Sequence, residues 1–246
     1  MPHLKYVIVA GRVVEIRKTY SPRYGKKIPR GENSSLTPEA MEKVNEREAE
    51  AKLRRIFNAN FKGGDFHAVF EYSAQYNPTP EEARKHLEKL LRDMRALYKK
   101  RGTVLKYITT TERGQRGRRK LHHHLVVNYM DTRLISALWP WSRVKFFPLD
   151  DSGQYAKLAE YLIKRTRVTY KNGDAGYKKR WNSSKNLKTP KVKTYVISAA
   201  KWRKEPKAWS GYYIEKDSLF DGVSAVTGYP MQFYSMVKLP VPHRRD

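Results

Sequence analysis

Two histidines separated by one residue, followed further along the chain by a tyrosine and a lysine, are the residues whose types and spacing could do chemistry. His122 and His124 lie in an apolar, β-branched stretch at 120–127, which predicts a strand. Because side chains alternate between the faces of a strand, both imidazoles point the same way and could hold one metal ion. Tyr161 and Lys164 lie in helical sequence. A metal that polarises a phosphate and a tyrosine that attacks it would cleave a phosphodiester.

A carboxylate could complete the metal site. Glu112 closes the strand expected over 104–111, and it returns beside His122 and His124 if this strand and the histidine strand form a hairpin. Two imidazoles and one carboxylate leave positions open for phosphate oxygens and water, as catalysis requires. Carboxylate and phosphate oxygens suit Mg²⁺ or Mn²⁺, so one of these is the expected cofactor. The alternative is a patch of solvent-facing histidines that binds no metal. His123 is expected to point to the other face of the strand and to pack against the helices.

Helical spacing makes Tyr161 the expected nucleophile, with Lys164 roughly 60° away on the same helix face. A phenol has an unperturbed pKa of about 10, so attack near neutral pH needs a metal or cation that favours the phenolate. Lys164 could do this, or could neutralise charge on the scissile phosphate. Tyr155 lies about 240° round the helix, so a single nucleophile is expected. The alternative is a tyrosine that only packs against the sheet.

The elements that must position these residues follow a β-α-β-β-α-β order with one more helix. Hydrophobic periodicity and turn residues predict strands at 66–72, 104–111, 121–129 and 144–147, and helices at 37–58, 80–101, 132–138 and 154–167. This order is typical of an α+β fold of the ferredoxin-like or RRM-like type, a split βαβ antiparallel sheet with helices on one face. The other face would then stay open for a ligand.

The expected division has three parts: a basic N-terminal arm and helix over 1–60, a catalytic core over 61–170, and a basic C-terminal extension over 171–246 packed on the core. Strand-like runs in the outer parts lie at 6–16, 194–198 and 231–237. The sequence assigns them no function.

Composition favours a polyanionic partner. The chain has 51 Lys and Arg against 24 Asp and Glu, a formal charge of +27, and 12% aromatic residues that could stack on bases. A ribosomal-type or merely soluble basic protein is the alternative. The absence of cysteine excludes zinc–thiolate sites and thiol nucleophiles and fits a reducing cytoplasm. No apolar run approaches the roughly 20 residues of a membrane helix. We therefore expect a cytoplasmic protein with no membrane partner. The sequence also has no Walker-type motif, so no nucleotide cofactor is expected.

Basic residues flank the expected site and are the candidate DNA contacts. They are Arg116, Arg118, Arg119 and Lys120 in a basic turn expected over 113–120, Lys157 and Arg165 in the helix expected over 154–167, and Lys179 and Arg180 in a basic block at 164–193. Arg and Lys would contact phosphates, while Trp181, Tyr177 or Trp202 could stack on bases. Binding of this kind weakens steeply with salt because it releases counterions. Solvated surface charge is the alternative for each residue.

These motifs resemble those of HUH endonucleases. The run at 122–124 resembles their His-hydrophobic-His motif, although a histidine in the middle position is a departure. The stretch 66–71 resembles their first strand motif, and 161–164 matches their Tyr-x-x-Lys motif. Glu112 occupies the place of their third, acidic metal ligand. The layout is similar to the rolling-circle replication initiation (Rep) proteins of bacterial plasmids, integrative elements and small phages.

The resemblance implies a mechanism. Tyr161 would attack a phosphodiester of a single-stranded or hairpin origin, leaving a 3′-hydroxyl that primes replication and a 5′-phosphotyrosine link to the protein. Transfer of that link to another 3′-hydroxyl would reseal the strand as a circle without ATP. A host helicase and a host polymerase would be the protein partners.

Two other functions remain open. A single-tyrosine transposase or a conjugative relaxase would use the same histidines and tyrosine, although the long histidine-triad spacing of relaxases is absent. A non-catalytic RRM-like nucleic-acid-binding protein would share the fold. Such a protein normally carries paired aromatic and glycine motifs on its central strands, where histidines stand here.

Overall fold

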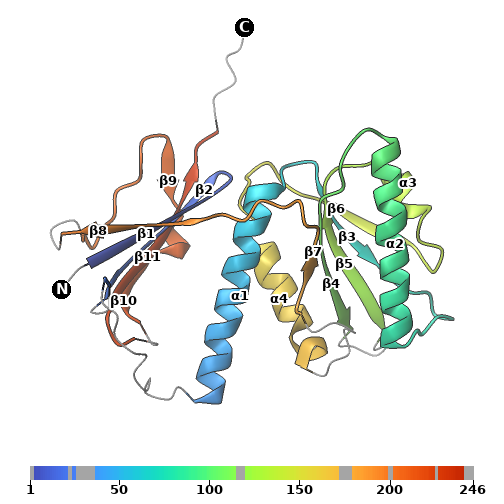
Figure 1. The fold of residues 1–246 in the computed structure, drawn as a ribbon, viewed down its shortest axis with the longest axis horizontal. Helices are drawn as coiled ribbons and strands as arrows, with labels where there is room; N and C mark the ends of the chain where they lie inside the picture. Colours follow the sequence, from blue (N-terminus) through green and yellow to red (C-terminus); the bar gives the residue numbers. More distant parts are fainter. Residues whose placement is uncertain are drawn as a thin grey trace, which may run out of the picture. The chain divides into compact units, whose positions relative to one another are not determined.

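Two antiparallel sheets organise the chain (Figure 1). The computed structural model describes residues 3–21, 24–25, 37–114, 120–171, 179–198, 202–224 and 227–240. Each sheet belongs to one of two units. The central unit is Ala49–Lys188, and the terminal unit combines Met1–Glu48 with Thr189–Asp246. Among the described residues, no helix combines the length and the apolar character needed to cross a membrane.

The central unit has the expected split βαβ order in an antiparallel sheet. Its elements are β3 (Phe66–Phe70), α2 (Pro80–Lys100), β4 (Tyr107–Arg113), β5 (Leu121–Val127), α3 (Thr132–Ser136), β6 (Val144–Pro148), α4 (Ala156–Lys171) and β7 (Asn182–Ser183), preceded by the end of α1 (Pro38–Asn60). The strand order is β6-β3-β5-β4-β7, and every neighbouring pair is antiparallel. The prediction of an α+β fold with an antiparallel sheet is therefore confirmed.

One face of this sheet is covered by α2 and α3. Helix α2 begins with a capping box, in which the side chains of Thr79 and Glu82 each bond the other residue's backbone N–H. Its apolar stripe includes Leu87, Leu90 and Met94, all buried in one core with apolar side chains of β3 and β5. Ile135 of α3 packs into that core as well.

The opposite face is also covered, so the prediction of helices on one face only was wrong. A second core contains Leu53 of α1 and Leu162 of α4, together with the sheet residues Ile108 and Val126. The apolar stripes of α1 and α4 need a buried surface, and β4 and β5 offer apolar side chains on both of their faces. The ligand face is therefore lined by a helix, α4, which is the helix that carries Tyr161.

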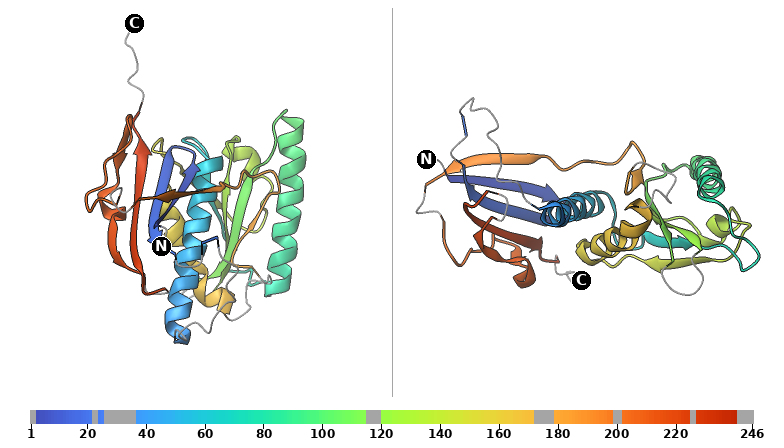
Figure 2. Two further views of the ribbon diagram at one scale, coloured as in Figure 1. Left: turned by 60° about the vertical axis from the view of Figure 1, so that its left-hand side comes forward. Right: turned by 90° about the horizontal axis from the view of Figure 1, so that it is seen from below.

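The terminal unit joins segments from the two ends of the chain in one sheet. Its elements are β1 (His3–Ala10), β2 (Val13–Tyr20), β8 (Val192–Ile197), β9 (Tyr212–Ile214), the 3-10 helix η2 (Lys216–Ser218), β10 (Phe220–Val223) and β11 (Pro230–Lys238). The strand order is β10-β11-β2-β1-β8, with β9 also paired to β11 (Figure 2). The unit boundaries fall after Glu48 and Lys188, whereas the sequence-based boundaries were 60/61 and 170/171. Pairing between distant strands explains this difference.

Candidate metal and nucleophile site

The β4–β5 hairpin brings a carboxylate opposite a histidine, as the sequence predicted. Its register pairs Glu112 with His122 and Thr110 with His124. Because directly paired residues and residues two apart share a face, all four side chains lie on the face that α4 covers. His123 points to the other face.

Glu112, His122 and His124 form a group that could hold a metal ion. One ligand atom from each residue lies within 4.8 Å of the others. Oε1 of Glu112 lies 2.5 Å from Nε2 of His122 and 3.2 Å from Nε2 of His124. Nε2 of His124 is buried and makes no hydrogen bond of good geometry, and a buried ring nitrogen without a partner suits a metal ligand. The donor set therefore fits a divalent cation.

The protonation states of Glu112 and His124 also favour a metal site. Burial raises the pKa of Glu112, but the neighbouring imidazoles of His122 and His124 outweigh burial and leave it at about 2. Burial also lowers the pKa of His124, although the carboxylate of Glu112 opposes this effect. The carboxylate is therefore charged and the buried imidazole is neutral near pH 7, which are the forms that bind metal ions.

Tyr161 of α4 lies against this group. Its ring centroid is 5.8 Å from that of His124, in an edge-on arrangement, and its side chain is 38% exposed. The guanidinium of Arg165, one turn further along α4, lies 5.2 Å from the Tyr161 ring centroid. The expected nucleophile thus stands beside the expected metal ligands, with a cation next to its ring.

Lys164 has a different immediate partner. Its ammonium donates a hydrogen bond to Oε1 of Glu160 at 2.5 Å, one turn back on α4. This hydrogen bond and the charge of Glu160 raise the pKa of Lys164. Arg165, rather than Lys164, is the cation that the structure places over the Tyr161 ring.

His67 of β3 is part of the same cluster, and sequence reasoning missed it. Its Nε2 lies 3.0 Å from Nδ1 of His124, and the two rings stack with centroids 5.2 Å apart. Its ring also stacks on Phe147 of β6 and meets Tyr161 edge-on at 6.1 Å. Burial first, and His124 second, lower the pKa of His67 to about 3, so this imidazole is neutral. The signal was one polar residue in an otherwise apolar strand, at 66–70.

The contact predicts that His67 orients His124 for metal binding. If Nε2 of His124 binds the ion, Nδ1 carries the proton and donates it in a hydrogen bond to Nε2 of His67. His67→Phe keeps a ring but removes the acceptor, so Mn²⁺ affinity should fall by roughly 10- to 100-fold. His67→Gln offers an amide oxygen in a similar place and should retain most of the affinity. Calorimetric titration with Mn²⁺ measures both; equal affinities for the two variants would contradict this role.

Two residues expected to stay outside the chemistry have structural partners. His123 is fully buried on the α2 face, with Nδ1 2.8 Å from Oγ1 of Thr111 and Nε2 3.2 Å from the hydroxyl of Tyr72. Tyr155 is buried, and its hydroxyl donates to the carbonyl of Asp150 at 3.0 Å. Both arrangements agree with packing roles.

The candidate DNA contacts are placed in different surroundings. The ammonium of Lys120 donates hydrogen bonds to the carbonyls of Ser73 and Tyr76 and stabilises the loop that contains these two residues. The exposed ones are Lys157, Arg165 and Lys179, while Arg180 is partly buried. Arg116, Arg118, Arg119 and Tyr177 lie outside the described residues.

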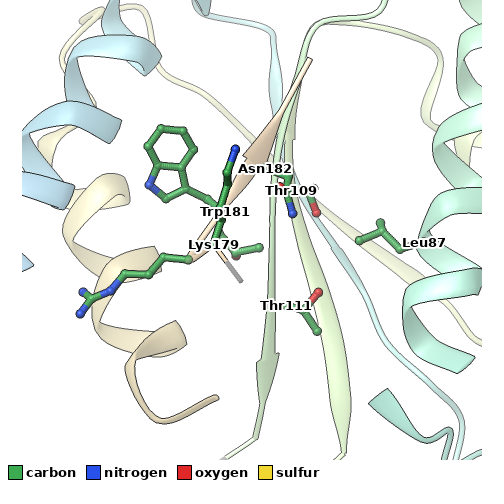
Figure 3. Close-up of a pocket in the computed structure, with 8 residues that line it drawn as sticks. Leu87, Thr109, Thr111, Lys179, Trp181 and Asn182 are labelled. Carbon is green, nitrogen blue, oxygen red and sulfur yellow. The ribbon is translucent and has the colours of Figure 1, made fainter. Parts of the chain in front are cut away.

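A basic cavity is lined by residues of β7, of the segment before it and of the middle of α1. Its volume is about 530 Å³, and its lining consists of Ala49, Lys52, Lys179, Arg180, Trp181, Asn182 and Ser183. The ammonium of Lys52 lies 5.7 Å from the Trp181 ring. A smaller pocket shares four of these residues, and Figure 3 shows Trp181 there on the opposite side of the strands from Leu87. The larger cavity combines an indole with three cationic side chains.

One family model matches the part of the chain that carries the candidate site. Residues 70–166 match the model of the family described as replication-associated protein ORF2/G2P. The matched stretch contains Glu112, His122, His124 and Tyr161, although it covers less than half of the chain. No curated protein and no solved structure matches the chain significantly. The match is consistent with the predicted resemblance to replication initiators and supports such a role.

Proposed function

Proceeding from the match of residues 70–166 to replication-associated proteins, we propose that the chain is a rolling-circle replication initiator of the HUH type, which nicks and rejoins single-stranded DNA at an origin. One observation carries the proposal. The Tyr161 ring lies 5.8 Å from the ring of His124, which forms a possible metal-binding group with Glu112 and His122. A nucleophile beside a metal-binding group is the arrangement that phosphodiester cleavage needs.

In the proposed nicking step, the phenolic oxygen of Tyr161 forms a bond to phosphorus and the bond from phosphorus to the 3′-oxygen breaks. The phenol loses its proton, and the departing 3′-oxygen gains one. The products are a free 3′-hydroxyl and a 5′-phosphotyrosine. Mg²⁺ or Mn²⁺, held by Glu112, His122 and His124, would polarise the phosphate and stabilise the charge that develops on it.

Cationic side chains of α4 would assist the same step. The guanidinium of Arg165 lies over the Tyr161 ring, where it would stabilise negative charge that develops on the phosphate. Lys164 is exposed one turn from Tyr161 and would neutralise phosphate charge by exchanging its bond with Glu160 for one with DNA. Joining reverses the chemistry, with a 3′-hydroxyl attacking the phosphotyrosine. Because that link conserves the bond energy, joining requires no nucleotide cofactor.

The cavity beside β7 supports a path for the DNA strand. Lys52, Lys179 and Arg180 would contact phosphates there, while the indole of Trp181 offers a face for a base. Lys157 on α4 would extend the contact, and Arg116, Arg118 and Arg119 are proposed as further phosphate contacts. The proposed setting is the host cytoplasm, where a helicase and a polymerase supplied by the host would continue replication.

An end-labelling experiment tests this function. The purified chain is incubated with a single-stranded DNA library and Mn²⁺ or Mg²⁺, and the products are separated on a denaturing gel. A 3′-label should move into a covalent protein–DNA band, while a 5′-label should mark a released fragment that a polymerase can extend. EDTA should suppress both. Retention of the 5′-label in the covalent band, or full yield in EDTA, would contradict the proposal.

A further inference from the structure

The terminal unit carries a segment in which tryptophans flank cations. Residues 202–209 read Trp-Arg-Lys-Glu-Pro-Lys-Ala-Trp, with three cations and one acid between the two indoles. We name these eight residues the basic–aromatic strap. They lie outside the stretch that matches the replication-associated family.

The strap is fastened to one face of the terminal sheet. Gln232 of β11 is fully buried, and its Nε2 donates to the carbonyls of Arg203 at 2.7 Å and Lys204 at 3.3 Å. At the other end, the backbone N–H of Trp209 donates to Sδ of Met236 at 3.4 Å. Gln232 and Met236 are four residues apart on one strand, so their side chains share a face.

The same face adds further cations. Register pairs Gln232 with Lys18, Lys18 with Lys5, and Lys5 with Tyr195, so all four side chains point to the strap. The ammonium of Lys5 lies 5.8 Å from the Trp209 ring. Lys18 is buried and donates to Oε1 of Gln232 at 2.9 Å. Burial, then Lys5, and also Arg203 lower the pKa of Lys18, while Asp221 opposes them. Positive charge is therefore concentrated here.

Aromatic rings form a connected row across this surface. The His3 ring lies 5.6 Å from that of Tyr20 and 5.9 Å from that of Trp202. Tyr20 in turn lies 5.2 Å from Tyr229. Exposure reaches 48% for Tyr195, 40% for Trp209 and 36% for Tyr229, so solvent reaches ring surface beside the lysines.

We propose that the strap and the sheet face beneath it bind single-stranded DNA, as a surface separate from the cleavage site of the central unit. Alternating flat rings and cations suit a polymer that alternates bases and phosphates, because rings stack on bases and cations contact phosphates. An acidic peptide offers charge without the bases. The inference extends the proposed function to a second DNA contact, and its test requires no cleavage.

Binding of a fluorescent oligothymidine to the full chain, measured by anisotropy in EDTA, tests the inference. Arg203→Gln with Lys207→Gln changes two exposed side chains only, and it should weaken binding several-fold and flatten the salt dependence. Lys5→Ala should reduce the logarithmic salt slope by about 0.7. Trp202→Ala with Trp209→Ala should weaken binding by at least about tenfold, as lost stacking predicts.

Arg17→Ala is the matched control. Arg17 is an exposed cation on β2 that points to the opposite face, where its guanidinium lies 4.5 Å from the Tyr6 ring. This variant should bind as the parent does. An equal loss in Arg17→Ala, unchanged binding in the Arg203 and Lys207 variant, or displacement of the DNA by polyglutamate at equal charge concentration would overturn the inference.

Failure of this inference is distinguishable from failure of nicking. Strap variants should still form the covalent adduct when a short DNA substrate is saturating, because Tyr161 and the metal ligands belong to the central unit. Strap-dependent DNA binding without adduct formation would support the second DNA-binding surface and contradict the nuclease proposal. Adduct formation without strap-dependent binding would support the nuclease proposal and contradict the second DNA-binding surface.

Discussion

Tyr161→Phe is expected to abolish the covalent protein–DNA adduct and to reduce nicking by roughly 10⁴-fold or more, the scale of losing a catalytic nucleophile. Phenylalanine keeps the ring that contacts His124, His67 and Arg165, so only the attacking oxygen is removed. Mn²⁺ affinity and DNA affinity should therefore stay close to those of the parent. Gel quantification of the adduct, together with both affinities, makes the measurement.

Tyr155→Phe is the matched control for this result. It also removes one hydroxyl from the same helical region, but that hydroxyl donates to the carbonyl of Asp150 in a buried core. The adduct should form in normal yield, with some loss of stability. An undiminished adduct in Tyr161→Phe would remove Tyr161 from its proposed role.

Glu112→Gln and His124→Ala should each abolish metal-dependent nicking, with Mn²⁺ affinity lowered by at least about 100-fold. Glutamine keeps the size of Glu112 but loses the charge that its low pKa maintains. Alanine at position 124 removes the buried ring nitrogen that faces Oε1 of Glu112 at 3.2 Å. Metal ions prefer a deprotonated carboxylate and a neutral imidazole, so both losses act on binding itself.

The control for the metal ligands is another histidine. His86 of α2 stacks on Trp141 with ring centroids 3.9 Å apart, and His86→Phe preserves that stacking. Titration with Mn²⁺, followed by calorimetry or by electron paramagnetic resonance, should show parental affinity for this variant. Parental affinity in both Glu112→Gln and His124→Ala would rule out the proposed metal site.

The sequence predicted the parts of the site that depend on local pattern. Alternation along 121–127 put His122 and His124 on one face, and the spacing of the two strands predicted the hairpin pairing that brings Glu112 beside them. Helical spacing separated Tyr161 from Tyr155. These inferences need only the short-range geometry of a strand or a helix.

Features that depend on contacts between distant segments were missed. His67 reaches His124 only because β3 pairs with β5, in a register that pattern alone does not give. The apolar stripe of α4 predicted a buried helix, but it did not predict which face of the sheet the helix packs against. The terminal sheet pairs β1 and β2 with strands from the other end of the chain. The ion pair between Lys164 and Glu160 was also missed, although it depends on local spacing alone. Glu160 stands four residues before Lys164, a spacing that favours such a pair on a helix.

The most direct measurement identifies the amino acid that carries the DNA. The adduct is formed with Mn²⁺, the DNA is trimmed with nuclease, and the peptides are sequenced by mass spectrometry. The proposed mechanism predicts a nucleotide 5′-phosphate attached to the Tyr161 hydroxyl in the α4 peptide, and at no other position. A nucleotide on Tyr155, or on any residue away from Glu112, His122 and His124, would contradict it.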